Sequence, residues 1–507
     1  MLDSPLSGSL KDYDRTLTTS VPELSSILAI QNFEQFFLIG IPPDKTPSDP
    51  PQVLMAYPPY QIPELNHKQI IEHALPYGTN KRKVKSGNYV IQEEFTFALR
   101  YGESEIFGTT AVFYSSSSDL PFFMSKSTKN TLFAFVILSR IPTLSTHFSF
   151  LTYLVLLITG GIPKFKVLNE VQDLPITQGP PIPDMEVKDF IACYSSLRIP
   201  ENFSRFIHIY HKCIPGMNPM DITDKLKLHF QPNDDTYAIL YTSLDTVCSI
   251  LEPKMILDVL SALYLDYQIL VIGSCLEEVS LTVLALVHLI DPMKYSGIVM
   301  PVLPQTDDYL DILQAPTPYI IGTIPSDKLL KLDFLDTTVF VNLDTKTVET
   351  GEDMPHYPNA ENIAKELKKE FSEKNKPQFL YAFQSEYLTH LKHKYLFTSQ
   401  NVNRIIRILR APLENVTTDF IYSFFVTDLD REDSSTVFNR ELFLMMMPQE
   451  PFFNGILSSQ TFEQWTSQKL DEFMILKGED IKKRKKRERR STLSVRQRKL
   501  SVKVLGI

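Results

Sequence analysis

The sequence predicts an α+β region, followed by an α/β region that a helical subdomain closes. First, between residues 32 and 160, short runs rich in aromatic and β-branched residues are separated by Pro, Gly and Ser clusters, which is typical of an antiparallel sheet. Second, from residue 254 onward, helical patterns of about twelve residues alternate with short apolar runs, which indicates βαβ units. Third, the strand-like runs end after residue 359 and helical patterns remain.

Size, composition and cysteine content are those of an ordinary soluble protein. The 507 residues exceed the size at which a single hydrophobic core stops growing, so we expect about two to four domains. The N-terminal residues lack a signal-peptide pattern, and the longest apolar run, residues 148–162, is too short to span a bilayer. The cysteines lie far apart, which predicts a reducing compartment without disulfides: Cys193, Cys213, Cys248 and Cys275. We therefore expect a cytoplasmic protein.

The α+β region is expected at residues 32–160, after a flexible segment at residues 1–31. Its strand-like runs are residues 33–40, 52–58, 89–99, 107–116 and 131–139. Helical patterns at residues 66–75 and 144–159 interrupt and follow them. Residues 161–231 are rich in proline and poor in periodicity, so they predict a linker region, although residues 194–214 suggest some ordered helix inside it. Whether this region packs on the rest stays open.

The α/β region follows at residues 232–358, and a helical subdomain at residues 359–480. Lys254–Leu265 and Glu277–Ile290 have helical periodicity and flank a buried parallel strand at residues 268–274. Further strands are expected at residues 296–304, 319–324 and 337–343. The helical patterns beyond them cover residues 362–374, 378–397, 402–409, 437–447 and 461–476.

The stretch from Ile298 to Thr323 has a defined shape but contains no Ser, Cys, His, Lys or Arg. Val299–Leu303 is expected to be a buried strand that stops at Pro304, and Pro316 forces an extended lead into the strand at Tyr319. A short helical turn between them would lie at the carboxyl end of the strand, where open α/β sheets bind ligands. Asp307 and Asp308 have two interpretations: Asp308 caps the turn and Asp307 is solvated, or both carboxylates meet basic residues of a partner.

Motifs of covalent or cofactor chemistry are missing from the sequence. No phosphate-binding loop, dinucleotide fingerprint, hydrolase elbow, zinc-protease or kinase signature occurs. Ser274 follows a strand, as hydrolase nucleophiles do, but Ser274 and Glu277 also form a capping box, which we favour. His390 and His393 could equally be a solvated helix face. We expect no cofactor and no metal. The body lacks a basic surface rich in aromatic residues, which argues against a nucleic-acid partner.

A basic tail is predicted at residues 481–507. Lys482–Lys503 contains twelve Lys or Arg and one Glu, a charge of +11, so the chain total of −9 leaves −20 for the body. The tail could be a disordered solubilising segment, a tether to anionic membranes, or a nuclear-import or nucleic-acid patch. Phosphorylation would weaken a tether at Ser491, which follows Arg489-Arg490, or at Ser501, three residues after Arg498. The tether residues would be Lys482, Lys483, Arg484, Lys485, Lys486, Arg487, Arg489 and Arg490.

Residues 232–330 resemble the central segment of the DENN domain family. They contain, in order, a helix with a small apolar end, a buried strand followed by Ser, a long helix stopped by Asp-Pro, Pro-Val-Leu-Pro, and Ala-Pro-x-Pro-Tyr before an Ile-Gly strand. Residues 340–349 continue the match, Ala98–Gly108 resembles the family's upstream segment, and residues 425–465 resemble its downstream segment. The resemblance covers about Phe33 to Leu476. The sequence departs from the family's pattern at two places. Residues 265–268 keep the usual acid but lack the base that follows it, and Ser296-Gly297 replaces an aromatic residue or His.

The resemblance implies a bilobed protein with an N-terminal longin-like lobe and a Rossmann-like α/β lobe. A Rab-type small GTPase would lie between the lobes and release GDP there, which is guanine-nucleotide exchange that acts in membrane traffic. Such nucleotide exchange needs no acid, base or nucleophile. The free energy that the exchanger gains by binding the open switch region lowers the affinity of the GTPase for its nucleotide by the same amount. A scaffold or effector without exchange activity is the alternative, and a GTPase-activating relative is a third. Partner contacts are expected at Ser274, Glu277, Pro301, Pro304, Asp307, Asp308, Pro316 and Tyr319.

Overall fold

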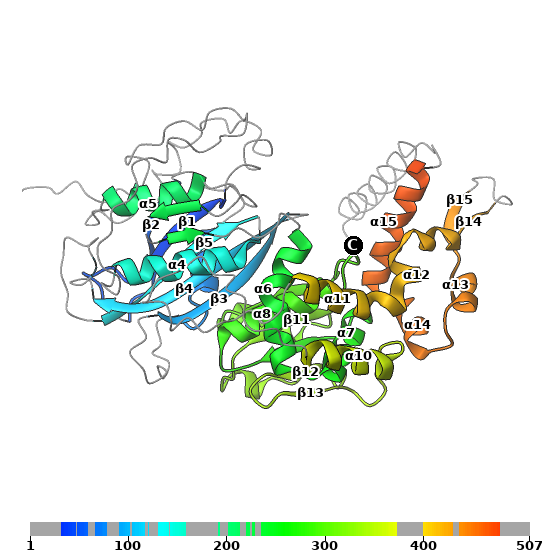
Figure 1. Cartoon of the computed structure of the whole chain (residues 1–507). Coiled ribbons are helices and arrows are strands. Elements are labelled where there is room, and N and C mark those ends of the chain that lie inside the picture. Colours follow the sequence, from blue (N-terminus) through cyan, green and yellow to red (C-terminus); the bar gives the residue numbers. More distant parts are fainter. Residues whose placement is uncertain are drawn as a thin grey trace, which may run out of the picture.

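The computed structural model shows an N-terminal lobe, an α/β lobe and a C-terminal subdomain (Figure 1). It describes residues 32–46, 48–58, 66–78, 91–101, 104–116, 120, 130–140, 142–158, 191–192, 201–212, 220–223, 226–228, 235–372, 399–428 and 435–476. The predictions for the N-terminal segment, the helix at 378–397 and the basic tail lie outside these residues. The fold class expected from the sequence, an α+β lobe followed by an α/β lobe, is confirmed.

The N-terminal lobe is built on a six-stranded sheet in the order β3-β4-β5-β1-β2-β6. Every pairing between its strands is antiparallel, as the predicted runs required. Strand β1 is buried on both faces, so the sheet needs a cover on each side. The strands are β1 (Gln35–Gly40), β2 (Gln52–Tyr57), β3 (Ile91–Tyr101), β4 (Ser104–Ser116), β5 (Asn130–Ser139) and β6 (Ile191–Ala192).

Helices α4 (Leu144–Ile158) and α5 (Glu201–Lys212) lie together on one face of this sheet (Figure 1). The rings of Phe150 and Tyr210 stack with centroids 3.7 Å apart and join the two helices, and Phe203 of α5 packs on Phe36 and Phe135 of the sheet. Both β6 and α5 come from residues 161–231. At these two elements the expected linker region therefore belongs to the N-terminal lobe. A small hairpin, β7 (Met220–Thr223) and β8 (Leu226–Leu228), also lies in this region.

The opposite face of the sheet packs on the α/β lobe. Helix α3 (His67–Ala74), capped by Asn66, covers some of this face, and Leu276, Val302 and Ile324 of the α/β lobe join the same apolar core. The backbone N–H of Thr96 in β3 donates to the Ser280 hydroxyl at 3.2 Å. The two lobes therefore share a continuous core.

The α/β lobe contains a five-stranded sheet in the order β10-β11-β9-β12-β13. The first four strands are parallel and β13 is antiparallel, so the predicted largely parallel sheet is confirmed. The strands are β9 (Ile269–Ile272), β10 (Ile298–Met300), β11 (Tyr319–Thr323), β12 (Val339–Asn342) and β13 (Thr347–Glu349). The helices are α6 (Asp235–Ile250), α7 (Pro253–Tyr264), α8 (Leu276–Leu289) and α9 (Asp307–Leu310), with one-turn 3-10 helices η4 (Asp311–Gln314) and η5 (Leu329–Lys331).

Strand β10 ends at Met300, before Pro301, and not at Pro304 as the sequence suggested. Pro301 has no N–H to donate to a sheet ladder, which explains the early end. The chain nevertheless stays beside β11, because the Leu303 N–H donates to the Gly322 carbonyl at 2.8 Å. A Cβ on Gly322 would lie 2.2 Å from the Pro301 carbonyl oxygen, so this close approach requires glycine.

The C-terminal subdomain is helical apart from one hairpin, β14 (Phe425–Asp428) with β15 (Ser435–Phe438). The helix expected at residues 437–447 was wrong at its start, where β15 runs to Phe438, and α13 begins only at Arg440. The short alternation of Phe425 and Phe438 with exposed Val426 and Val437 is the strand signal that was missed. The helices are α10 (Ala360–Ser372), α11 (Ser399–Arg410), η7 (Ala411–Leu413), α12 (Glu414–Thr417), η8 (Asp419–Phe424), α13 (Arg440–Met446), α14 (Pro451–Ile456) and α15 (Gln460–Leu476).

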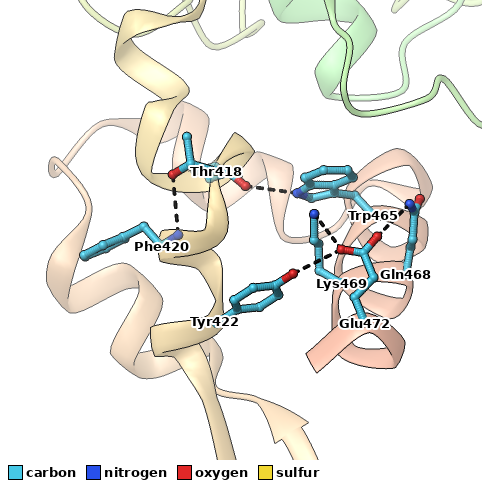
Figure 2. Close-up of polar contacts among 8 residues, drawn as sticks. Thr418, Phe420, Tyr422, Trp465, Gln468, Lys469 and Glu472 are labelled. Carbon is cyan, nitrogen blue, oxygen red and sulfur yellow. Dashed lines mark hydrogen bonds and ion pairs between the residues drawn. The ribbon is translucent and has the colours of Figure 1, made fainter. Parts of the chain in front are cut away.

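Polar contacts hold α15 against η8 inside this subdomain (Figure 2). Glu472 accepts hydrogen bonds from Lys469 at 2.7 Å and from Tyr422 at 3.1 Å. The Trp465 ring N–H donates to the Val416 carbonyl at 3.0 Å, and the Lys469 ammonium lies 4.9 Å from the Trp465 ring centre. These bonds from α15 to α12 and η8 therefore join the three helices into a single packed unit.

Asp266 attaches the subdomain to the α/β lobe. It follows α7 in the left-handed region, with φ 56°, and its carboxylate accepts from the Thr461 N–H at 3.1 Å and from the Thr461 hydroxyl at 2.6 Å. Ser296 also hydrogen-bonds the Thr461 hydroxyl. Burial raises the pKa of the Asp266 carboxyl, and the bonds from Thr461 partly offset this effect. Asp266 and Ser296, from two loops of the α/β lobe, thus meet the same threonine.

Candidate interaction site at the carboxyl edge

The carboxyl ends of the four parallel strands form one edge of the α/β sheet. The chain leaves this edge at Gly273 after β9, at Pro301 after β10, at Ile324 after β11 and at Leu343 after β12. In open α/β sheets this edge is where ligands bind. Here Val302 and Ile324 are buried against the N-terminal lobe, so the edge is partly covered and its remaining surface lies beside the lobe junction.

Ser274 and Asp344 meet on this edge because β9 and β12 are neighbours in the sheet. The Asp344 carboxylate accepts from the Ser274 N–H at 3.0 Å and from the Ser274 hydroxyl at 2.8 Å, and both residues are exposed. Helix α8 has Cys275 as its N-cap residue, so the expected capping role of Ser274 is wrong. The Ser274 hydroxyl instead ties two strand ends together. Glu277, half-buried, lies in the first turn of α8.

Gln305 organises the loop that follows Pro304. Its side chain donates to the Thr323 hydroxyl at 2.9 Å and accepts from the Ser326 hydroxyl at 3.0 Å. Its backbone N–H donates to the Pro76 carbonyl of the N-terminal lobe at 2.8 Å. Pro301 and Pro304 are both buried. The prolines therefore shape this loop from within, and a partner cannot contact them without displacing their neighbours.

Helix α9 presents Asp307 and Asp308 to solvent. Thr306 is its N-cap residue, so the interpretation of Asp308 as the cap is wrong. Asp307 accepts a hydrogen bond from the Lys328 ammonium at 2.6 Å, although the Asp307 side chain is 86% exposed. An ion pair this exposed is worth about 0–1 kcal/mol, so it leaves both carboxylates available to a basic partner.

His73 fixes α9 to the N-terminal lobe. Its ring contacts Tyr309 edge-on, with centroids 5.3 Å apart, and lies 5.4 Å from Phe97 of β3. The His73 Nδ1–H donates to the Gln69 carbonyl at 2.9 Å. Burial lowers the pKa of His73 to about 4, so the ring is neutral at pH 7. Sequence reasoning missed this residue, because the contact joins positions 236 residues apart.

The remaining predicted contact residues lie at the opposite edge of the sheet. Tyr319 begins β11, is fully buried and donates through its hydroxyl to the Leu313 carbonyl at 3.2 Å. Pro316 is exposed at this amino edge. Gln268 donates to the carbonyls of Ala315 at 2.7 Å and Thr317 at 3.2 Å, and so orders the Ala-Pro-x-Pro stretch. The structure thus separates Pro316 and Tyr319 from Ser274, Asp307 and Asp308.

Among the residues that the structure describes, no three His, Cys, Asp or Glu side chains are arranged to bind a metal ion. Nor does any described helix combine the length and apolar character needed to cross a membrane. The carboxyl edge presents the exposed carboxylates of Asp307 and Asp308, the hydrogen-bonded pair of Ser274 and Asp344, and a rigid connection to the N-terminal lobe. This arrangement suits recognition of another protein.

Residues 130–346 match the model of the DENN (AEX-3) domain. This segment of the chain is similar to the DENN domain. The match runs from β5 through the turn after β12, and it includes the loop after every parallel strand of the α/β sheet. The resemblance seen in the sequence is therefore confirmed for this segment, and the carboxyl edge lies within it.

Two curated relatives are MAP kinase-activating death domain proteins. The one from Mus musculus is 32% identical over 144 residues, which are 27% of this chain and 9% of the relative. The one from Caenorhabditis elegans is 29% identical over 142 residues, 27% of this chain and 10% of the relative. The matched segment spans about a tenth of each relative. The likeness therefore concerns this segment and not the remainder of those proteins.

Proposed function

We propose that this chain is a guanine-nucleotide exchange factor for a Rab-type small GTPase. The observation that carries the proposal is the DENN match, which contains all the loops of the carboxyl edge. The activity requires only a surface that binds the nucleotide-free partner better than the nucleotide-bound one. Picomolar affinity for nucleotide corresponds to a binding free energy on the order of 16 kcal/mol, so the exchanger must bind the open GTPase with a comparable free energy.

In this proposal the partner's switch region lies against the carboxyl edge, beside the lobe junction. Asp307 and Asp308 meet basic residues of the partner, and Ser274 with Asp344 supplies a second polar contact. Exposed carboxylates raise association rates and select partners more than they add affinity, so apolar contacts near the junction would supply most of the binding energy. The shared core between the lobes keeps these groups fixed while the partner opens.

An activating role, in which GTP hydrolysis is accelerated, would need an arginine at the site. Residues 235–372, which form the α/β lobe and α10, contain no arginine. This favours exchange over activation. An effector would differ from an exchange factor in its preferred partner: it would bind the GTP form of the GTPase, whereas an exchange factor binds the nucleotide-free form.

The proposal places the protein in the cytoplasm, peripherally on vesicle or endosomal membranes, with the basic tail as a tether to anionic lipids. The test of the activity is GDP release from a complete Rab panel with the full chain at catalytic amounts. At least one member should lose GDP faster than it does alone. If every member releases GDP at its intrinsic rate, the exchange function is excluded.

A further inference from the structure

Exposed apolar side chains are concentrated in the C-terminal subdomain. Among the described residues, seven of the nine large apolar side chains that are exposed lie there, and two lie in the α/β lobe. The seven are Phe420, Val426, Val437, Met445, Met446, Ile475 and Leu476. Single exposed apolar residues are ordinary, whereas residues that adjoin one another mark an interaction surface.

Two of the seven exposed residues adjoin one another on the β14–β15 hairpin. Val426 and Val437 are direct cross-strand partners and are 41% and 45% exposed. The adjacent pair, Phe425 and Phe438, points to the other face of the hairpin, where Phe473 of α15 lies 5.5 Å from Phe425. Alternation along a strand therefore turns the valine pair away from α15. We call this pair the valine face.

The charge of the subdomain selects the kind of segment that can cover the valine face. Residues 399–476 carry eleven Asp or Glu and six Lys or Arg, a net charge of −5. An anionic membrane surface would be repelled by this charge, whereas a basic segment with apolar side chains would be attracted.

The chain itself contains such a segment. Leu500, Val502 and Val504 alternate with Ser501 and Lys503, which is the pattern of a strand with one apolar face. Residues 491–507 carry four basic residues and no acid. A short alternating strand of this kind complements an exposed pair of cross-strand valines.

The connection is long enough for the segment to reach the valine face. Helix α15 ends at Leu476, three residues after Phe473, which contacts the hairpin. Residues 477–492 can span up to about 50 Å when extended. Passing around a hairpin needs far less, since packed sheets are only about 10 Å apart.

We propose that residues 491–507 of this chain dock on the valine face, with Leu500, Val502 and Val504 covering Val426 and Val437. This contact is a property of the C-terminal subdomain and does not depend on exchange activity. It would hold the apolar end of the tail on the protein, while the basic residues between Lys482 and Arg490 stay accessible.

The test is a cysteine cross-link in the full chain, with the four native cysteines replaced by serine. Val437→Cys with Val502→Cys is compared with Ser458→Cys with Val502→Cys, since Ser458 is an exposed residue elsewhere in the same subdomain. A short bismaleimide should join the first pair within one molecule in several-fold higher yield than the second. The yield should fall at about 1 M salt, where the Debye length is only about 3 Å.

Hydrogen exchange gives an independent readout without engineered cysteines. Leu500→Asp with Val502→Asp should raise exchange in the β14–β15 hairpin and leave the β9–β12 sheet unchanged. Equal yields for the two cysteine pairs together with unchanged hairpin exchange would overturn the proposal. Cross-links formed only between molecules would overturn it in favour of a second copy as the occupant.

Discussion

His73 makes the lobe junction sensitive to acid, and the size of the effect follows from its burial. Its pKa lies near 4 in the folded protein and near 6.5 when the chain is unfolded, so its neutral form is favoured by folding. The resulting stability is complete above pH 6.5 and is lost as the pH falls towards 4. Between pH 7 and pH 5 the loss amounts to about 2 kcal/mol.

The assay is hydrogen exchange of peptides that cover β3 and α9, normalised to the intrinsic rates at each pH. A loss of about 2 kcal/mol corresponds to roughly 30-fold more frequent opening at pH 5. His73→Phe keeps the ring contacts with Tyr309 and Phe97 and removes the titrating group, so it should show little of this change. Other groups titrate equally in both proteins. The same pH response in wild type and His73→Phe would refute the reasoning.

Three further changes test other features of the molecule. Asp307→Asn with Asp308→Asn should slow GDP release from the partner GTPase more than about tenfold, a loss of about 1.4 kcal/mol, with little change in melting temperature. The matched control is Asp336→Asn with Asp353→Asn, which removes two exposed carboxylates beyond the amino edge of the sheet. An equal effect of both pairs would show a general charge effect. Gly322→Ala should destabilise the α/β lobe by more than about 2 kcal/mol because its Cβ would lie 2.2 Å from the Pro301 carbonyl oxygen, whereas Gly351→Ala, whose nearest neighbour would be 3.6 Å away, should fold normally; thermal unfolding that ranks the two equally would contradict this. Deleting residues 481–507 should abolish binding to anionic vesicles in low salt and leave exchange in solution nearly unchanged, and vesicle binding that survives the deletion would leave the tail without a tether role.

Local periodicity was sufficient for the elements that bury a clear face. The strand at β9 and the helix at α8 were placed within about two residues, because their apolar patterns and the Asp-Pro stop are local signals. Prolines were harder to interpret: Pro301 ends β10, whereas the sequence analysis placed the end of this strand at Pro304. The hairpin β14–β15 was missed because each of its strands has only four residues.

The candidate site was only partly predictable, since the order of strands in the sheet assembles it. The order β10-β11-β9-β12 brings Ser274 beside Asp344, 70 residues away. Tyr319 is the first residue of β11, so the parallel direction of this strand puts it at the other edge. The ion pair of Asp307 with Lys328 joins loops after different strands. His73 has no motif of its own and gains its role from packing between two lobes. None of these pairings leaves a periodic signal in the sequence.

The most direct measurement of the central claim is a binding comparison of the full chain with one small GTPase in three states. The GTPase that responds in the exchange panel is immobilised nucleotide-free, with GDP and with GTP. An exchanger stabilises the open partner, so the account predicts the strongest retention on the nucleotide-free form and release on adding either nucleotide. Strongest retention on the GTP form would contradict the account and identify an effector.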